Sequence, residues 1–348
     1  MATNNMDSND LKTALVDGLV NESVMKKITI LSQNLDTPLS DMIGTGSHGN
    51  EYHSWTQDTN KLPNPVNAQV DGRDSTENDA VPGTRTGNHS QISTKDIAIS
   101  TRADTSDTIG FQKASAHQLM MRSEDLRRDV EAGMCSNNIS RPDNGDATAG
   151  LSGGLQAWLS TNSFVASDGS LGGFNTSTGI VDAVTNGTAE ALTETKIRDA
   201  AQKVYQQGGN PSKLLMVPDV CRQLSSYMFT SSARIATLTS ETTQSNSAAT
   251  AKGSVNVMVT DFNVTLDFVP SRTMRNYDYG TTDAESCAFL IDTSKLQLSW
   301  LHGIRAERLA KNGLSERWLM SGDWTLVVDD EKAHACINSI DNTAAVTA

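Results

Sequence analysis

The sequence is poor in aromatic residues and has no long hydrophobic run. Phe, Trp and Tyr make up 5% of its 348 residues, and hydrophobic residues make up 37%. Apolar runs such as Leu214–Val217 span only a few residues, far fewer than the ~20 that a membrane-crossing helix requires. We therefore expect no membrane span. At a typical ~150 residues per domain, the length predicts two compact units or one elaborate one.

Positive charge is also scarce. The chain has 28 Lys and Arg against 41 Asp and Glu, a formal net charge of -13. Because binding to phosphate groups draws on clustered Lys and Arg, this chain is not expected to wrap nucleic acid through its overall field. Any contact with nucleic acid would be local and weak, and the net charge mainly favours solubility.

Cysteine motifs and targeting signals are missing as well. The four cysteines are far apart, without a C-x-x-C pair, which favours free buried thiols in a reducing compartment over a disulfide or a metal site. Residues 1–10 are polar and lack the apolar region of a secretory signal. We predict no metal and no cofactor. The cysteines are Cys135, Cys221, Cys287 and Cys336.

The strongest helical pattern covers residues 108–135. Leu119, Leu126, Val130 and Met134 fall near one stripe of this predicted helix. Its other face is expected to be charged, with opposite charges at helical neighbour spacings. The charged residues of that face are Glu124, Asp125, Arg127, Arg128, Asp129 and Glu131.

Weaker patterns predict three more helices. Residues 11–31 show helical spacing behind a polar leader, typical of an arm that docks on something else, and Pro38 is expected to stop any continuation. A helix is expected at 193–207. Another is expected to open at Pro218-Asp219, directly after a short buried strand at 214–217.

Residues 44–94 are rich in Asn, Asp, Gly and Thr and nearly free of apolar clusters. Strand-like pieces occur only near 51–56 and 92–100. Such a long stretch without a core of its own is unusual inside a compact domain. Ordering each residue costs ~1–2 kcal/mol that only contacts can offset. The stretch is therefore either disordered or an extended hairpin whose partner surface lies on another molecule.

The last third of the chain is mostly strand. Its segments alternate or form short apolar runs, and Lys311–Gly313 supplies a turn. Helices followed by mainly antiparallel strands predict the α+β class. The expected strands are Val255–Val259, Val264–Val269, Ala288–Ile291, Leu296–Leu301, Ile304–Leu309, Glu316–Met320 and Trp324–Val328.

Two glycine motifs match functional patterns by letter alone. Gly44–Gly49 spells G-x-G-x-x-G, but the residues after it read as extended rather than as the helix that a dinucleotide site requires. Gly150–Gly154 spells the G-x-S-x-G of a nucleophile elbow around Ser152, but no buried strand precedes it. We interpret it as a flexible glycine turn. A serine hydrolase using Ser152 is kept as an alternative.

Other polar clusters also fail to form a catalytic pattern. His48 and His53 lie in a polar loop without a third ligand, which favours an exposed pair over a zinc site. The run Asp329–Glu331 is typical of a solvated turn rather than an acid–base pair. No active site is predicted, and we do not expect an enzyme.

An ordered series of segments resembles the major head proteins of tailed bacteriophages, in the group around the major capsid protein of phage SU ten. Residues 51–58 resemble the entry to that group's extended loop, 91–101 its return strand and 110–133 its spine helix. Asn312 and Asp323 stand where the group usually has Thr and Glu. Further similar segments are Gly153–Asn162, Val217–Asp219, Leu309–Gly313 and Trp324–Val328.

The resemblance implies the Hong Kong 97-like capsid fold. It also implies that the extended loop lies over a neighbouring subunit and that geometry, rather than chemistry, is the task of the chain. The implied parts are an N-terminal arm (1–45), an extended loop (46–95), a peripheral domain with the spine helix (96–149 and 293–328; helix about 108–135) and an axial domain (150–292 and 329–348).

The resemblance implies a subunit that self-assembles as hexamers and pentamers into an icosahedral virion shell around double-stranded DNA, without sequence specificity, in the host cytoplasm. Scaffolding, portal and cement proteins are candidate partners. An encapsulin-like compartment shell is the alternative. Some relatives cross-link through a loop lysine, but here we interpret Lys61 as an ordinary solvated side chain. The expected assembly contacts are Trp55, Asp58, Lys61, Arg127, Arg128 and Glu131.

Overall fold

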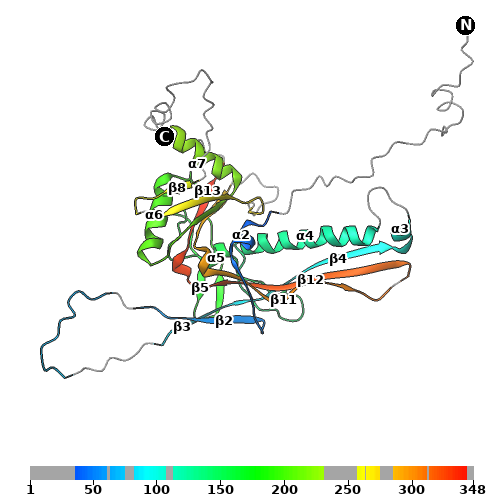
Figure 1. The fold of residues 1–348 in the computed structure, drawn as a ribbon, viewed down its shortest axis with the longest axis horizontal. Helices are drawn as coiled ribbons and strands as arrows, with labels where there is room; N and C mark the ends of the chain where they lie inside the picture. The colour runs from blue at the N-terminus through cyan, green and yellow to red at the C-terminus, as the bar shows by residue number, and fades with distance from the viewer. Residues whose placement is uncertain are drawn as a thin grey trace, which may run out of the picture.

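The computed structural model describes residues 36–60, 63–74, 82–106, 113–230, 257–262, 264–274, 285–311 and 313–342. Figure 1 shows three parts: a long flat limb of one helix over extended strands, a lobe of helices around a second sheet, and a loop that projects from the lower side. The mixture of helices and largely antiparallel strands confirms the α+β prediction. None of the described helices is long and apolar enough to cross a membrane.

The limb is built on a four-stranded sheet in the order β1-β11-β12-β4. β11 (Leu296–Arg308) and β12 (Ser315–Val328) form a long antiparallel hairpin, and β4 (Gln91–Ser100) pairs with β12. β1 (Gly44–Ser47) pairs in parallel with β11. The sequence pattern does not predict β1, because Gly-Thr-Gly-Ser contains no apolar residue.

The prediction of four short strands between residues 296 and 328 is wrong, because the structure has two long ones. β11 passes through irregularities between Trp300 and Arg305 without leaving the ladder. Ser321, Gly322 and Asp323 all pair with β4. Polar residues interrupt the apolar pattern there, but backbone pairing continues through them. The predicted turn between the strands is confirmed in its described part.

The spine helix α4 (Ala114–Met134) lies along the limb sheet. The predicted apolar stripe is confirmed where Leu126, Val130 and Met134 are buried. Gly133 allows close approach, because an added Cβ would lie 2.9 Å from the Trp324 ring. The predicted start at residue 108 is wrong for Lys113, whose backbone is extended ahead of the helix. Residues 107–112 lie outside the described part.

The lobe contains a five-stranded sheet in the order β13-β10-β7-β9-β8, covered by α6 and α7. The predicted helix at 193–207 is confirmed as α6 (Glu194–Gln206), whose first turn is capped when the Lys196 amide donates to the Thr193 hydroxyl. The helix opening at Pro218 is confirmed as α7 (Pro218–Thr230). The strands are β7 (Lys213–Met216), β8 (Val257–Val259), β9 (Thr265–Pro270), β10 (Glu285–Ile291) and β13 (Ala335–Asp341).

Several short elements lie outside the limb sheet and the lobe sheet. Pro38, predicted to stop any continuation of a helix at 11–31, starts the short helix α2 (Pro38–Met42), in keeping with the preference of proline for the first helical turn. The predicted helix at 11–31 lies outside the described residues. The remaining elements are β2 (Tyr52–Gln57), β3 (Thr84–His89), α3 (Thr101–Thr105), α5 (Leu155–Trp158), β5 (Gly173–Asn175), β6 (Ile180–Asp182), η1 (Thr293–Lys295) and η2 (Glu331–Ala333).

Candidate assembly surfaces

An antiparallel hairpin carries the projecting loop away from the body. β2 and β3 pair from Tyr52 opposite His89 to Gln57 opposite Thr84. Trp55 faces inward, with its ring centroid 5.6 Å from that of Trp158. Trp55, predicted as an assembly contact, therefore has an apolar partner within its own subunit.

Beyond the strands, the loop is exposed. Val66 and Val70 expose 80% and 78% of their surface, and the loop lies apart from the body in Figure 1. Asp58 is exposed, and its carboxylate accepts the backbone N–H of Thr59 at 2.8 Å. Lys61 lies outside the described residues. The structure thus places two apolar side chains in solvent on a segment with little core of its own.

Two amide side chains hold the hairpin on β12. Asn88 Nδ2 donates to the Leu326 carbonyl at 2.8 Å, and Gln57 Nε2 donates to the Asp329 carbonyl at 2.7 Å. Sequence reasoning missed both residues. No local signal marks them, because their partners lie 238 and 272 residues away along the chain.

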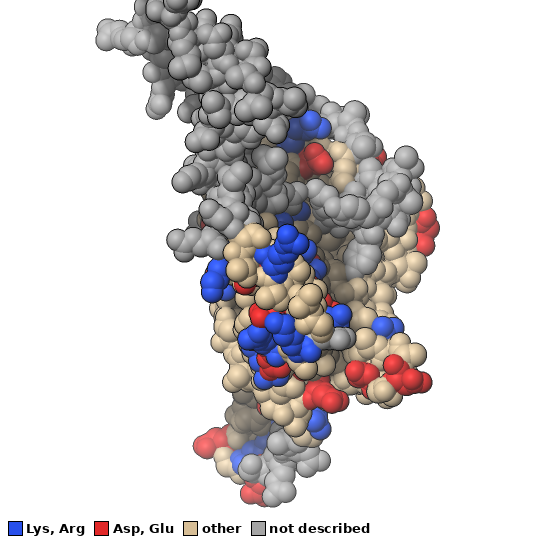
Figure 2. All heavy atoms as spheres, turned by 90° about the vertical axis from the view of Figure 1, so that its right-hand side faces the viewer, with Lys and Arg blue, Asp and Glu red and all other residues tan. Residues whose placement is uncertain are grey.

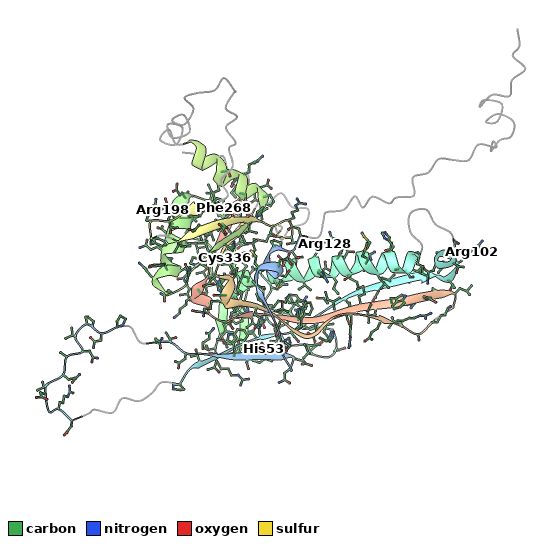
Figure 3. The ribbon with its side chains drawn as sticks, in the orientation of Figure 1. His53, Arg102, Arg128, Arg198, Phe268 and Cys336 are labelled. Carbon is green, nitrogen blue, oxygen red and sulfur yellow. The ribbon has the colours of Figure 1, made fainter. Side chains whose placement is uncertain are left out.

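His48 and His53 are half-buried at the base of this hairpin, so the prediction of an exposed loop pair is wrong. Figure 3 shows His53 on β2, and its ring centroid lies 5.2 Å from that of His48. Burial lowers the pKa of both imidazoles; the proximity of His53 lowers that of His48 further. The described residues contain no cluster of three or more His, Cys, Asp or Glu side chains suited to a metal.

The charges of the spine helix are partly paired within the chain. Arg127 is exposed, whereas Arg128 is half-buried and forms an ion pair with Asp125; Figure 3 labels Arg128 near the end of α4 closest to the lobe. Asp129 pairs with Lys95 of β4 at 2.5 Å. Arg127 is therefore the predicted helix contact that presents its side chain to solvent.

Glu131 does not lie on a solvent-facing charged surface, contrary to the prediction. Its side chain is 0% exposed, and its carboxylate accepts the backbone N–H groups of Leu39 at 2.6 Å and Ser40 at 2.9 Å. Burial raises the pKa of Glu131, and these hydrogen bonds oppose the rise. The carboxylate thus fastens α2 to the spine helix, with Leu39 buried in the core shared by Val130.

The far end of the limb carries basic side chains that the sequence pattern did not single out. Figure 2 views this end and shows Lys and Arg gathered on it beside Asp and Glu. Arg102 is labelled there in Figure 3. Arg308 pairs with Glu316 at 2.5 Å where β11 and β12 approach their turn, and Leu314 in that turn is 85% exposed. This tip is a second exposed surface.

The two glycine motifs have structural roles. Ser152 is 0% exposed, and its hydroxyl oxygen accepts N–H groups from Asn88 and Leu326 at 3.2 and 3.3 Å. A substrate has no access to such a hydroxyl. Gly44–Gly49 contains the edge strand β1 and is followed by β2, rather than by the helix of a dinucleotide site.

The acidic run at the end of β12 is more than a solvated turn. Glu331 accepts the backbone N–H groups of Ser160 and Thr161, each at 2.7 Å. Asp330 caps the short helix η2 through the Lys332 amide. These carboxylates therefore hold the segment after α5 and the start of η2.

The cysteines are free thiols, as predicted, but only Cys135 and Cys336 are buried. Cys221 and Cys287 are half-buried. Burial raises the pKa of the Cys135 and Cys336 thiols, so neither is an activated thiolate. Figure 3 shows Cys336 in the lobe.

Known proteins resemble this chain in sequence and in fold. A family model described as SU10 major capsid protein matches residues 3–341. The major capsid protein of Escherichia phage Phieco32 is 26% identical over 197 residues, which cover 53% of this chain and 53% of that protein. The match thus spans about half the length of this relative.

Two solved structures show the same architecture. One is described as the capsid of a native GTA particle, with a TM-score of 0.56, 12% identity, and coverage of 94% of this chain and 98% of that chain. The other is the holo-SrpI encapsulin complex from Synechococcus elongatus PCC 7942, with a TM-score of 0.55, 11% identity, and coverage of 95% and 96%. Such low identities establish the fold alone. That fold is Hong Kong 97-like, and since the family model spans nearly the whole sequence, the chain belongs to the SU10 major capsid protein family.

Proposed function

We propose that this chain is the major shell subunit of a tailed-bacteriophage head. The observation that carries the proposal is the extended hairpin, whose loop exposes Val66 and Val70 away from a flat body. Such a segment gains contacts only by lying on another molecule, and a second copy of the chain is always present during assembly. Family membership supports the same function.

The arrangement of the elements supports the proposed division into parts, although the limb sheet also includes β1 and the first half of β4, which lie in the ranges given to the arm and the extended loop. The limb sheet and α4 would form the peripheral domain, and the five-stranded sheet with α6 and α7 would form the axial domain. The N-terminal arm would leave from α2, at the point where Glu131 fastens the chain. The proposed boundaries stay as expected from the resemblance: 1–45, 46–95, 96–149 with 293–328, and 150–292 with 329–348.

The subunits would form hexamers and pentamers of an icosahedral shell, assembled in the host cytoplasm and present in the virion. Closed symmetry repeats each contact many times, so modest interfaces add up to a stable shell. The acidic balance of the chain, -13, suits an inner surface that encloses double-stranded DNA without gripping it. Scaffolding, portal and cement proteins would be further partners.

Among the predicted assembly contacts, the exposed Asp58 and Arg127 are proposed to touch neighbouring subunits directly. Arg128 forms an ion pair with Asp125, and it would contact a neighbour only through the 22% of its side-chain surface that is exposed. Trp55 and Glu131 would act within the subunit, by holding the hairpin and α2. Lys61 stays a prediction outside the described residues.

An encapsulin-like compartment shell is the second candidate, because the encapsulin structure covers the chain as fully as the capsid structure does. The contents of the particles separate the two candidates. Particles isolated from the natural source should contain nuclease-protected double-stranded DNA if the chain encloses a genome. A protein cargo without DNA would favour the compartment.

We do not propose an enzymatic activity. The hydrolase alternative requires an accessible Ser152, and that side chain is fully buried among hydrogen-bond donors. Negative-stain electron microscopy of the purified full chain tests the proposed function. Closed shells or separate capsomers are expected, whereas a persistent compact monomer at high protein concentration would contradict it.

A further inference from the structure

One long extended segment, residues 84–100, divides between two partners at Ser90. Its second half, β4, pairs with β12 up to Gln91 opposite Trp324. Its first half, β3, pairs with β2 instead. The next backbone groups of β12 are therefore left without a strand partner on this side, and they belong to Leu326.

At this branch point, side chains make the hydrogen bonds to β12 that a neighbouring strand would otherwise make. The Leu326 carbonyl accepts Asn88 Nδ2 at 2.8 Å, and the Leu326 N–H donates to the Ser152 hydroxyl at 3.3 Å. Asn88 also binds the backbone of the glycine turn. Its Oδ1 accepts the Gly153 N–H at 2.9 Å, and its Nδ2 lies 3.2 Å from the Gly153 carbonyl oxygen. Asn88 is 0% exposed, so these directed bonds fix one point of the hairpin.

Gln57 fixes a second point on the same inward face of the hairpin. Its Nε2 donates to the Asp329 carbonyl at 2.7 Å, just beyond the end of β12. Gln57 pairs with Thr84, four residues before Asn88. At ~3.3 Å per residue the two anchors lie roughly 13 Å apart along the hairpin. Two separate anchors fix the direction in which the β2–β3 hairpin points. A single anchor would leave the hairpin free to rotate about it.

We propose that Asn88 and Gln57 are positioning residues that set the direction in which the extended loop leaves the subunit. The proposal rests on the proposed function, because the target of the loop is a neighbouring copy of the chain. Trp55 between the anchors supplies apolar contact with Trp158, but apolar packing is not directional. The amides therefore determine whether the loop tip meets its site on the neighbour.

Two variants with matched controls test this proposal. Asn88→Asp keeps the size of the side chain, but a carboxylate cannot donate to the Gly153 and Leu326 carbonyls. Gln57→Ala removes the outer anchor, which is the solvent-exposed hydrogen bond from Gln57 to the Asp329 carbonyl. Thr56→Ala changes the exposed, outward-facing neighbour of Gln57. Asn162→Asp changes another buried asparagine that donates to a backbone carbonyl, that of Lys332 at 2.7 Å, outside the hairpin.

The first measurement is hydrogen–deuterium exchange of unassembled subunits. Loss of an anchor should speed exchange in residues 52–57 and 84–89 by about fivefold, the factor expected for one net hydrogen bond of about 1 kcal/mol, and leave β7 and β10 unchanged. Asn162→Asp should lower subunit stability but keep the hairpin exchange of the unmodified chain. Unchanged hairpin exchange in both anchor variants would overturn the proposal.

The second measurement is the yield and diameter of assembled particles by electron microscopy. Both anchor variants should give fewer or irregular shells, and Thr56→Ala should give regular ones. Regular shells from subunits whose hairpins exchange rapidly would also overturn the proposal. If Asn88→Asp does not fold, Gln57→Ala alone decides. A failure of the unmodified chain to form shells would contradict the proposed function, while exchange in free subunits would still test the anchors.

Discussion

In the limb, α4 buries Leu126, Val130 and Met134 against a four-stranded sheet, whereas the β2–β3 hairpin places only Trp55 against an apolar surface of the body. The remaining described contacts between the hairpin and β12 include amide hydrogen bonds from Asn88 and Gln57. The limb is thus stabilised mainly by burial, and the hairpin is oriented mainly by directed polar bonds.

The different interactions of the limb and the hairpin give these regions different roles: the limb core mainly stabilises the subunit, and the hairpin mainly serves assembly. Apolar burial contributes most of the folding free energy and tolerates small shifts, because it has no preferred direction. A few hydrogen bonds contribute less free energy but specify geometry. We therefore expect changes in the body to alter unfolding and changes in the hairpin to alter how copies fit together. The following four predictions test that division, in order of decreasing effect on subunit stability.

Trp158→Ala should have the largest effect, because Trp158 is buried where both regions meet. Its ring lies 5.6 Å from Trp55 and stacks on Phe174 at the same centroid distance. Replacing a buried Trp by Ala typically costs about 3–5 kcal/mol. Urea unfolding of the purified subunit measures the loss. Leu314→Ala, at an exposed turn, is the control, and a cost below about 1 kcal/mol for Trp158→Ala would contradict the assignment of the core.

Acid should weaken the lobe through His334. Burial lowers the pKa of this imidazole to about 4. Since the unfolded side chain titrates near 6.5, stability is fully present above that pH and is lost as the pH falls from about 6.5 toward 4. A shift of this size corresponds to about 3 kcal/mol.

The variant His334→Gln should reduce this acid sensitivity. Thermal unfolding from about pH 7 to pH 4 compares it with the unmodified chain and with His53→Gln at the hairpin base, where the imidazole is only half-buried. The lobe variant should change the pH dependence more. Equal changes would contradict the contrast between the two regions.

Glu131→Ala should have an intermediate effect. It leaves the Leu39 and Ser40 N–H groups without their carboxylate acceptor, which costs about 1–3 kcal/mol for buried groups. Because the pKa of Glu131 is raised, its stabilising contribution is present at acid pH and declines as the pH rises through that pKa. Glu131→Gln should remove this part of the pH dependence. Denaturant titrations at about pH 4.5 and pH 7 measure both effects, and an unchanged pH profile would contradict them.

Val66→Ser should have the smallest effect on the subunit, because the side chain is 80% exposed. We expect an unchanged unfolding midpoint and a reduced yield of shells, since the loop loses apolar area that would be buried on a neighbour. Thr59→Ser, also exposed on the loop, is the control. Normal shell yield for Val66→Ser, measured by sedimentation, would show that this loop position is not an interface.

Several elements defined by local sequence patterns were predicted correctly. The stripe of α4 and the start and end of α6 depend on residues within a few turns of each other, so periodicity and capping predicted them. The strand-like pieces predicted near 51–56 and 92–100 are confirmed as β2 and β4. The ordered similarity to phage head proteins supplied the family and the fold.

The sequence by itself determined that the chain combines helices with mainly antiparallel strands, that no glycine motif has the context of an active site, and that residues 44–94 lack a core of their own. The predicted order of helices before strands is wrong, because β1–β4 precede the spine helix α4. Only the tertiary structure decided that Glu131 is buried against α2 and that β1 pairs with β11. It also decided that Asn88 donates to the Leu326 carbonyl where the pairing of β4 with β12 ends. The reason is sequence distance. A carboxylate or an amide has the same local pattern in solvent or in a core, and its role is set by partners from 92 to 238 residues away.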